Sequence, residues 1–203
     1  MMDINSTQDH TTQQIKNIVL IGFMGSGKTV VGRCLARMMD FEFVDTDEEI
    51  EDVTGLPIAR LLKKYGETRF RSEEELVLKK LLKRSGLIIA IGGNLNMENR
   101  NLELLKEGSF FVLLKAEPEV LYQRLRRKNT RPLLGGNPTI DRVKQLLSER
   151  ENRYELLADY FLNTSDVTVD EAAEMIIKEY NKNILLEDEE GVSEFRSNRE
   201  NKI

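Results

Sequence analysis

The chain has 203 residues, 40% of them hydrophobic, so it can bury one good core and we expect a single domain. Its 35 acidic and 30 basic residues give a formal net charge of −5, which excludes the broad positive surface of a nucleic-acid-binding protein. Its single cysteine excludes an internal disulfide and a cysteine-based metal cage. Since no apolar stretch approaches the ~20 residues of a membrane span and no secretory signal is present, we expect a soluble cytoplasmic protein without a membrane partner.

Residues 1–15 are polar and have no apolar period, so we expect them to be disordered and the folded domain to span residues 16–180. In chain order, the apolar spacing then predicts a strand at 17–21, a helix at 29–39, a strand at 41–44 and helices at 48–53, 57–65 and 69–84. The predicted buried face of the last helix consists of Phe70, Leu76, Leu78, Leu81 and Leu82.

The second half begins with a continuous apolar run at 87–91 that stops at Gly92 and Gly93, which is typical of a buried strand ending in a tight turn. It continues with a helix at 99–107, a strand at 110–114, helices from 118 to about 127 and at 140–158, a strand at 160–162 and a helix at 169–180. Residues 129–138 hold two of the four prolines and predict a loop, which belongs to a mobile lid at about 124–138. The acidic segment 181–203 has no core pattern, and we expect it to be disordered.

The alternation of strands and helices predicts an α/β fold of three layers, in which helices cover both faces of a five-stranded parallel sheet. Binding sites in such sheets lie at the carboxyl ends of the strands. The segment from Gly22 to Thr29 follows the first strand, precedes the first helix and matches the pattern G-x-x-x-x-G-K-S/T. We therefore expect a P-loop NTPase fold.

The residue types of this segment explain how it would hold the phosphates of a nucleoside triphosphate. Gly22, Gly25 and Gly27 permit backbone angles that turn successive N–H groups inward, and the positive end of the following helix adds to the attraction. Lys28 supplies a positive charge near the β and γ phosphates. The hydroxyl of Thr29 is an oxygen ligand for a Mg2+ ion that bridges those phosphates.

A P-loop alone serves switch GTPases, motor ATPases and small-molecule kinases. The Asn-Lys-x-Asp segment with which switch GTPases read guanine does not occur in the sequence. Motors usually need larger domains than 203 residues provide, whereas a compact chain with an arginine-bearing loop is typical of a kinase with a lid. The sequence therefore favours a small-molecule kinase.

Further motifs, taken with the P-loop, resemble the shikimate kinase family over residues 17 to about 180. They are residues 43–47 (FVDTD), 66–71 (GETRFR) with Glu74, 92–93 (GG), 99–100 (NR), 131–134 (RPLL) and Arg150 with Tyr154. The resemblance implies transfer of the γ-phosphoryl group of ATP to the 3-hydroxyl of shikimate, in the route to chorismate and the aromatic amino acids, with Mg2+ as the metal ion. We also expect a monomer.

On the donor side, the resemblance implies a set of nucleotide contacts made by Gly25, Ser26, Gly27, Lys28, Thr29, Val30, Arg124 and Arg131. Arg124 resembles the arginine that stacks on adenine; the alternative is one more solvated charge in the basic cluster 124–128. Arg131 resembles the lid arginine that neutralises charge on the transferred group, so we expect it to be catalytic together with Lys28 and Asp47. Thr29 and Asp45 resemble the pair that reaches Mg2+, with Asp45 acting through water.

Shikimate is a small anion with three hydroxyls, so its site needs a cationic fork for the carboxylate and a carboxylate close to the hydroxyls. Arg71 and Arg150 look like this fork. By resemblance, Asp47 bonds the hydroxyls and orients the attacking oxygen, and the backbone N–H of Gly93 meets the substrate carboxylate. Glu74 resembles the glutamate that steadies the substrate-binding arginine.

Each of these assignments has a structural alternative. Alternate residues of a strand share a face, so we expect Asp45 and Asp47 to point into one cleft, but the same pair is also typical of a solvated acidic turn that starts a helix. For Arg71 the alternative is a surface ion pair with Glu74 or a neighbouring glutamate. For Gly93 it is a simple turn at the end of a strand.

Asn94 stands where the family has a third consecutive glycine. Its side chain would project near the acceptor pocket, which leaves two other functions open: a related kinase with an altered acceptor, such as a gluconate-type kinase, and a nucleotide-binding regulator with a weakened acceptor site. The set of Asp47, Arg71 and Arg150 disfavours the related kinase. The regulator is disfavoured by a larger intact set, which consists of Lys28, Asp45, Asp47, Arg71, Arg131 and Arg150.

Overall fold

The computed structural model describes residues 17–92, 100–126 and 139–200, and for residues 185–200 it describes the backbone alone. The segment 1–15 and most of the predicted lid therefore lie outside the described residues. Within the described ranges each predicted strand and helix is present, and most of their ends differ from the predicted ones by only a few residues.

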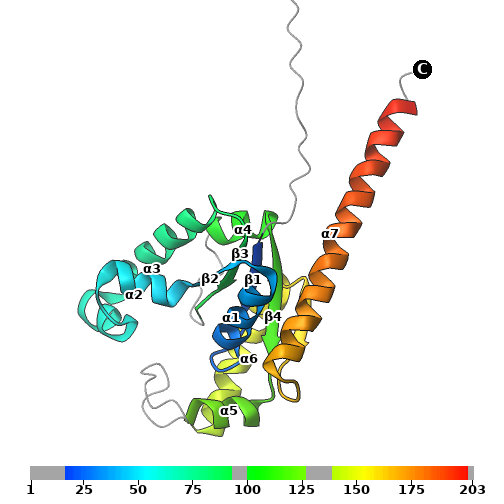
Figure 1. Ribbon diagram of the computed structural model, residues 1–203. Helices are drawn as coiled ribbons and strands as arrows, with labels where there is room; N and C mark the ends of the chain where they lie inside the picture. Colours follow the sequence, from blue (N-terminus) through cyan, green and yellow to red (C-terminus); the bar gives the residue numbers. More distant parts are fainter. Residues whose placement is uncertain (1–16, 93–99, 127–138, 201–203) are drawn as a thin grey trace, which may run out of the picture.

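Five parallel strands form one sheet, as predicted, and the structure orders them β2-β3-β1-β4-β5 (Figure 1). The strands are β1 (Asn17–Ile21), β2 (Glu42–Asp45), β3 (Leu87–Ala90), β4 (Ser109–Lys115) and β5 (Tyr160–Asn163). All residues of β1 are buried, and this strand lies between β3 and β4. Because the strands are parallel, the segments that follow β1, β2 and β3 leave the sheet at the same edge.

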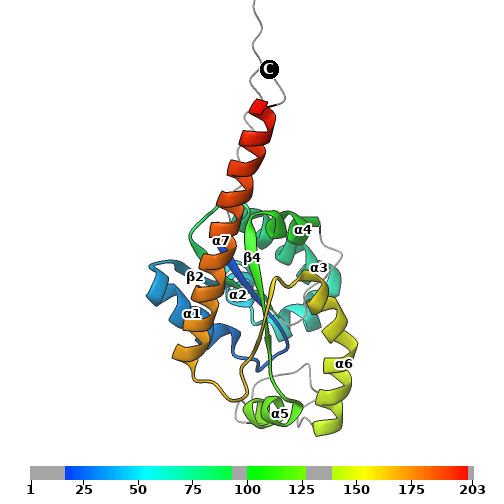
Figure 2. The same cartoon turned by 90° about the vertical axis from the view of Figure 1, so that its right-hand side faces the viewer.

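Two layers of helices cover the sheet, as an α/β/α architecture requires (Figures 1 and 2). The helices are α1 (Lys28–Met39), α2 (Thr46–Thr54), α3 (Ile58–Leu81), α4 (Arg100–Glu107), α5 (Pro118–Arg126), α6 (Ile140–Leu157) and α7 (Val169–Glu200). Side chains of a strand alternate between its faces, so β1 supplies both cores. Ile18 and Leu20 pack with α1 and α7, whereas Val19 and Ile21 pack with α3, α4 and α6.

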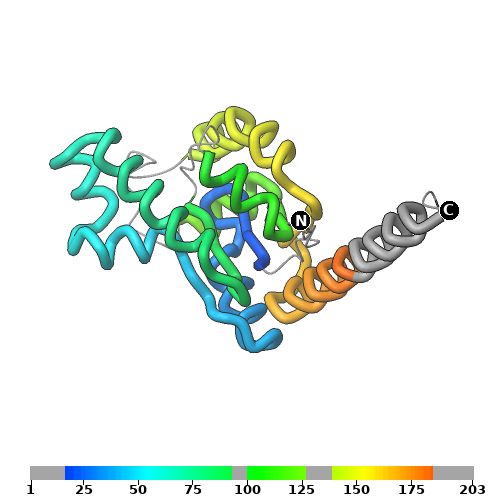
Figure 3. Tube along the Cα trace, turned by 90° about the horizontal axis from the view of Figure 1, so that it is seen from above, coloured from blue at the N-terminus to red at the C-terminus, as the bar shows by residue number. Residues whose placement is uncertain are grey.

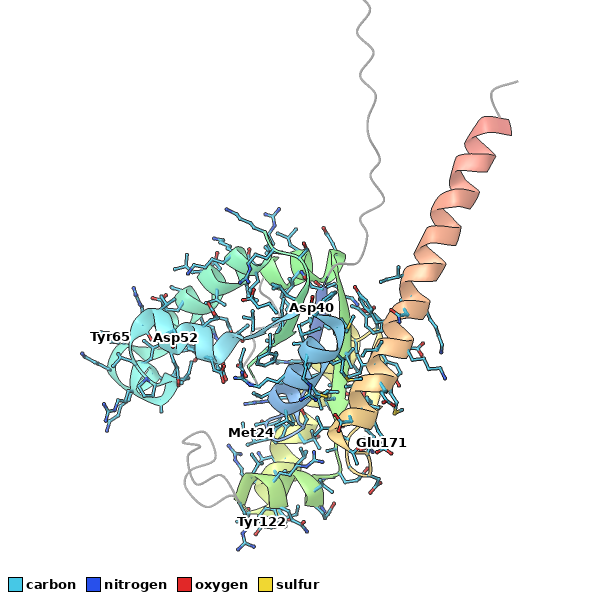
Figure 4. The ribbon with its side chains drawn as sticks, in the orientation of Figure 1. Met24, Asp40, Asp52, Tyr65, Tyr122 and Glu171 are labelled. Atoms are coloured by element: carbon cyan, nitrogen blue, oxygen red, sulfur yellow. The ribbon has the colours of Figure 1, made fainter. Side chains whose placement is uncertain are left out.

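A third, smaller core lies where α5 and α6 meet the segment that follows β1. Phe23 and Met24 of that segment are buried and belong to one cluster with Leu121 of α5 and Val143 of α6. Figure 4 shows the labelled Met24 on the side of the sheet that faces α5, which carries Tyr122. These apolar contacts hold the predicted P-loop against the two helices that border the lid segment.

One helix, α3, occupies the region where two helices were predicted, with a break in its angles at Gly66 (φ 78°, ψ 178°). The break therefore falls in the predicted gap, at a residue that adopts this conformation readily because it has no Cβ. The predicted burial of Leu76 was wrong, since this side chain is 52% exposed. Buried positions recur three and four residues apart from Phe70 to Val77 and Leu78, and Leu76 falls outside that face.

The expectation of a disordered segment from residue 181 was wrong as far as Glu200, because α7 continues to that residue. The segment contains no proline, and extending an existing helix costs far less than nucleating a new one. Seen from above, α7 leaves the sheet on the side away from α2 and the first part of α3 (Figure 3). Of the helices that the structure describes, none is both long enough and apolar enough to cross a bilayer.

Candidate active site

A cavity of about 390 Å3 lies at the carboxyl ends of β1, β2 and β3. Its walls come from the loop after β1, the start of α2, the residues after β3, the end of α5, the loop after β5 and the start of α7. The described residues that were predicted to contact the nucleotide or the metal all line it: Gly25, Ser26, Gly27, Lys28, Thr29, Val30, Asp45 and Arg124. Asp47, which was predicted to bind the substrate hydroxyls, lines it as well. The fold thus gathers these residues around one cavity.

The loop from Gly22 to Thr29 has the backbone that its glycines predict. Gly22, Gly25 and Gly27 have φ values of 137°, 85° and 104°, in the range that side chains disfavour. A Cβ on Gly22 would also overlap the carbonyl oxygen of Leu114 in β4. The loop thus lies against the sheet at Gly22. Gly27 is the N-cap of α1, so the last two residues of the motif already belong to the helix.

Lys28 folds back over this loop. Its Nζ donates hydrogen bonds to the carbonyl oxygens of Gly22 at 2.7 Å and Phe23 at 3.2 Å, so the ammonium group stays beside the backbone that precedes it. Val30, in the first turn of α1, is 52% exposed and adds an apolar surface to the cavity. A cation set against a glycine loop at a helix N-terminus is suited to binding phosphates.

Thr29 and Asp45 meet although they are 16 residues apart in the sequence. The hydroxyl of Thr29 donates to Asp45 Oδ2 at 3.1 Å. The other carboxylate oxygen, Oδ1, accepts the backbone N–H of Asp47 at 3.1 Å and so caps α2. Asp45 therefore starts a helix and also faces the predicted metal ligand Thr29, while its role toward the metal stays a prediction.

The donor set of Thr29 and Asp45 fits Mg2+. This ion prefers oxygen ligands and is usually held by one or two protein groups together with water and phosphates. Within the described residues, no cluster of three or more His, Cys, Asp or Glu side chains suits a metal held by the protein alone. A hydroxyl next to a carboxylate is therefore the arrangement in this cavity that matches the predicted ion.

Asp47 lies in the cavity, but not for the reason inferred from the sequence. The strand β2 ends at Asp45 and α2 begins at Thr46, so Asp47 belongs to the first turn of a helix and does not share a strand face with Asp45. Its carboxylate fills the space next to Gly92, where an added Cβ would overlap it. The backbone N–H of Gly92 donates to the hydroxyl of Thr46 at 3.0 Å, which fastens the end of β3 to the start of α2.

Gly92 is thus a positioning residue that the sequence did not assign. The Gly-Gly pair at positions 92 and 93 was interpreted as a tight turn, and only the second glycine received a role. The structure shows that the first glycine is needed because the Asp47 carboxylate occupies the place of its side chain. Gly93, Asn94 and Arg131 lie outside the described residues, and their roles remain predictions.

Arg71 and Glu74 form the predicted pair. Arg71 Nη1 donates to Glu74 Oε2 at 3.0 Å, and Nη2 donates to Glu67 Oε1 at 3.0 Å. Glu74 is buried and Arg71 only partly exposed, so this is not a simple surface ion pair. A glutamate held in the interior fixes the plane of the guanidinium, as the steadying role requires.

Arg150 lies on α6 close to Tyr154, which is buried in the same hydrophobic cluster as Phe70, the neighbour of Arg71. Burial raises the pKa of the Tyr154 hydroxyl, while the charge of Arg150 and a hydrogen bond with it act in the opposite direction. The two arginines of the predicted fork therefore flank one cluster on the same face of the sheet. Neither lines the cavity that holds the P-loop.

Arg124 is held at the wall of the cavity. Its Nη1 donates to the carbonyl oxygen of Gly25 at 3.3 Å and to Thr164 Oγ1 at 3.0 Å, and its Nη2 donates to the carbonyl oxygen of Thr164 at 2.7 Å. The alternative of one more solvated charge is therefore wrong for this arginine. Only the structure shows these contacts of Thr164, because they join segments that are remote along the chain.

Known proteins are similar to this chain over most of its length. The family model described as shikimate kinase matches residues 24–181. A shikimate kinase of Pelotomaculum thermopropionicum is 45% identical over 170 residues, which cover 82% of this chain and 98% of the relative. A shikimate kinase of Thermodesulfovibrio yellowstonii is 42% identical over 168 residues, covering 83% of this chain and 96% of the relative.

A solved structure, a shikimate kinase from Acinetobacter baumannii in complex with shikimate, matches with a TM-score of 0.77 and 36% identity over 84% of this chain and 96% of that one. The fold and the cavity thus define a P-loop kinase. The chain belongs to the shikimate kinase family. The predicted family, fold class and enzyme class are confirmed.

Replacing Gly92 by alanine should displace the Asp47 carboxylate, because the new methyl group overlaps it. A misplacement of about 1 Å in a reacting group costs about 100-fold in rate, so we expect a loss of kcat of that order, with ADP binding close to normal. Steady-state kinetics measure the loss. Gly55→Ala is the control for backbone strain without a clash, since its φ of 66° disfavours a side chain but its added methyl meets nothing within 4 Å. A Gly92→Ala enzyme with unchanged kcat would contradict this role.

Proposed function

We propose that this protein is a shikimate kinase that transfers the γ-phosphoryl group of ATP to the 3-hydroxyl of shikimate, giving shikimate 3-phosphate and ADP. The observation that carries the proposal is the cavity in which the P-loop, with Lys28 and Thr29, faces Asp45 and Asp47. This arrangement supports a donor that carries phosphates and an acceptor that must lose a proton. Family membership supports shikimate as that acceptor over a gluconate-type substrate.

The donor half of the site comprises the P-loop, Lys28, Thr29 and Asp45. The inward-facing backbone N–H groups hold phosphate oxygens, and Lys28 can leave the loop carbonyls to which it now donates and neutralise the charge that develops on the transferred group. Thr29 and Asp45 would hold Mg2+. The ion would supply positive charge that offsets the negative charge of the phosphates. Arg131, which lies outside the described residues, would add a further positive charge from the lid.

The acceptor half comprises Asp47, Arg71, Arg150 and Gly93, with Glu74 in a supporting role. Asp47 would accept a hydrogen bond from the reacting hydroxyl and take up its proton as the new P–O bond forms. Arg71 and Arg150 would bind the substrate carboxylate, because a guanidinium matches a carboxylate in shape and charge. Glu74 holds Arg71 in place through the 3.0 Å contact.

The same proposal includes a monomer in the cytoplasm. Both follow from the sequence expectations, and neither bears on the chemistry of the site.

The function is tested by an assay of ADP release with ATP, Mg2+ and a panel of small hydroxy acids that includes shikimate and gluconate. We expect turnover with shikimate alone, and we expect Lys28→Ala to abolish it while the protein stays folded. The product is identified by its phosphorus NMR spectrum. Turnover with another acid but not with shikimate would refute the proposed acceptor and leave the kinase class intact.

Arg71→Lys tests the substrate fork while keeping a positive charge beside the buried Glu74. Lysine lacks the planar pair of donors, and charge-assisted hydrogen bonds contribute about 1.5–3 kcal/mol, so we expect the KM for shikimate to rise at least about tenfold and the KM for ATP to stay unchanged. The control is Arg69→Lys, two residues away on α3, where Arg69 pairs with Glu73. An unchanged KM for shikimate would remove Arg71 from the site.

Asp45→Asn tests the metal ligand without removing the cap of α2, because asparagine caps helices as well as aspartate does. Mg2+ should lower the Kd of the unaltered protein for ADP. Losing the charge of Asp45 should make this effect of Mg2+ about 10- to 100-fold smaller. Titration calorimetry with and without Mg2+ measures this difference. If Mg2+ lowers the Kd for ADP by the same factor in the unaltered protein and in Asp45→Asn, then Asp45 serves only as a helix cap.

A further inference from the structure

Thr164, the first residue after β5, joins three segments that are far apart in the sequence. Its side chain is buried, with only 4% of the residue exposed, and it also lines the cavity. Its backbone N–H donates to the carbonyl oxygen of Lys115 at 2.8 Å. Its hydroxyl lies 2.9 Å from the carbonyl oxygen of Ser26 in the P-loop, 138 residues away, and 3.1 Å from that of Lys115.

A threonine hydroxyl has a single proton, so it can donate fully to only one of these carbonyl oxygens. Lys115 already accepts the backbone N–H of Thr164, and Ser26 is the closer partner. The hydroxyl therefore donates to Ser26. Its lone pairs accept Nη1 of Arg124 at 3.0 Å, so both functions of the hydroxyl are used.

The contact with Ser26 sets the orientation of the next peptide. A trans peptide is planar, and its C=O and N–H bonds point to opposite sides. Holding the Ser26 carbonyl toward Thr164 therefore turns the N–H of Gly27 away from Thr164, and we expect that N–H to face the phosphates. Gly27 is the N-cap of α1, so the positive end of the helix acts at the same place.

The contacts with Arg124 set a second element of the site. The guanidinium is fixed by Thr164 Oγ1, the Thr164 carbonyl and the Gly25 carbonyl. Removing the hydroxyl would loosen both the Ser26–Gly27 peptide and the arginine that is expected to contact the nucleotide base.

We propose that Thr164 is a positioning residue of the nucleotide site: its hydroxyl orients the Ser26–Gly27 peptide and the Arg124 guanidinium, without itself binding the phosphates. This inference rests on the proposed function, since it assigns ATP to the cavity. It extends that function by naming the contact that couples the loop after β5 to the P-loop and to α5.

The test compares three variants at position 164. Thr164→Val keeps the shape of the side chain and removes the hydroxyl, Thr164→Ala removes it with less bulk, and Thr164→Ser keeps it. A lost hydrogen bond that leaves buried partners unsatisfied weakens an interaction by about tenfold, so we expect the Kd for ADP and the KM for ATP to rise by about that factor in the valine and alanine variants. The KM for shikimate should stay unchanged, and serine should restore ADP binding.

Thr54→Val is the matched control, because Thr54 also donates its hydroxyl to a backbone carbonyl, that of Ile50 at 2.7 Å, but does not line the cavity. Thermal unfolding confirms that each variant is folded. Unchanged ADP affinity in both hydroxyl-free variants would overturn the proposal, and so would an equal rise in the KM of both substrates. ADP affinity is measured without an acceptor, so failure of shikimate to react in the unaltered protein is a separate result.

Discussion

The burial of β1 on both faces is the constraint on which the site depends. Held between two parallel neighbours, β1 ends at the same edge of the sheet as β2 and β3, so the segments after these strands meet. The P-loop cannot slide along this edge, because Gly22 lies against the Leu114 carbonyl and Phe23 and Met24 are buried among α5 and α6. Apolar packing thus determines where the P-loop lies.

Polar contacts between remote segments then set the finer geometry. The bond from Thr29 to Asp45 joins α1 to the start of α2, and the bond from Thr164 to Ser26 joins the loop after β5 to the P-loop. Each such bond contributes only about 1 kcal/mol, which is small beside the burial of the core. Because each 1.36 kcal/mol changes a rate about tenfold, losing one such contact in the site changes a rate several-fold.

Most of the fold and the donor half of the site could be predicted from local patterns. Apolar periodicity located the strands and helices, and the glycine spacing located the P-loop. The predictions that were wrong also rested on local patterns. Leu76 was assigned to the wrong face of α3, and a charged segment without a core pattern was expected to be disordered although α7 runs through it to Glu200. Asp47 was placed in the correct cavity on the assumption of a strand where a helix begins.

By itself the sequence determined the α/β/α architecture, the P-loop and the family, because these depend on patterns that span a few residues or on the order of short motifs. Only the tertiary structure decided that Gly92 makes room for the Asp47 carboxylate, and that Arg124 is fixed by Thr164. The first contact spans 45 residues of sequence, from 47 to 92, and the second spans 40, from 124 to 164. No local pattern specifies such distances, because they result from how the strands order themselves in the sheet and how α5 packs beneath the P-loop.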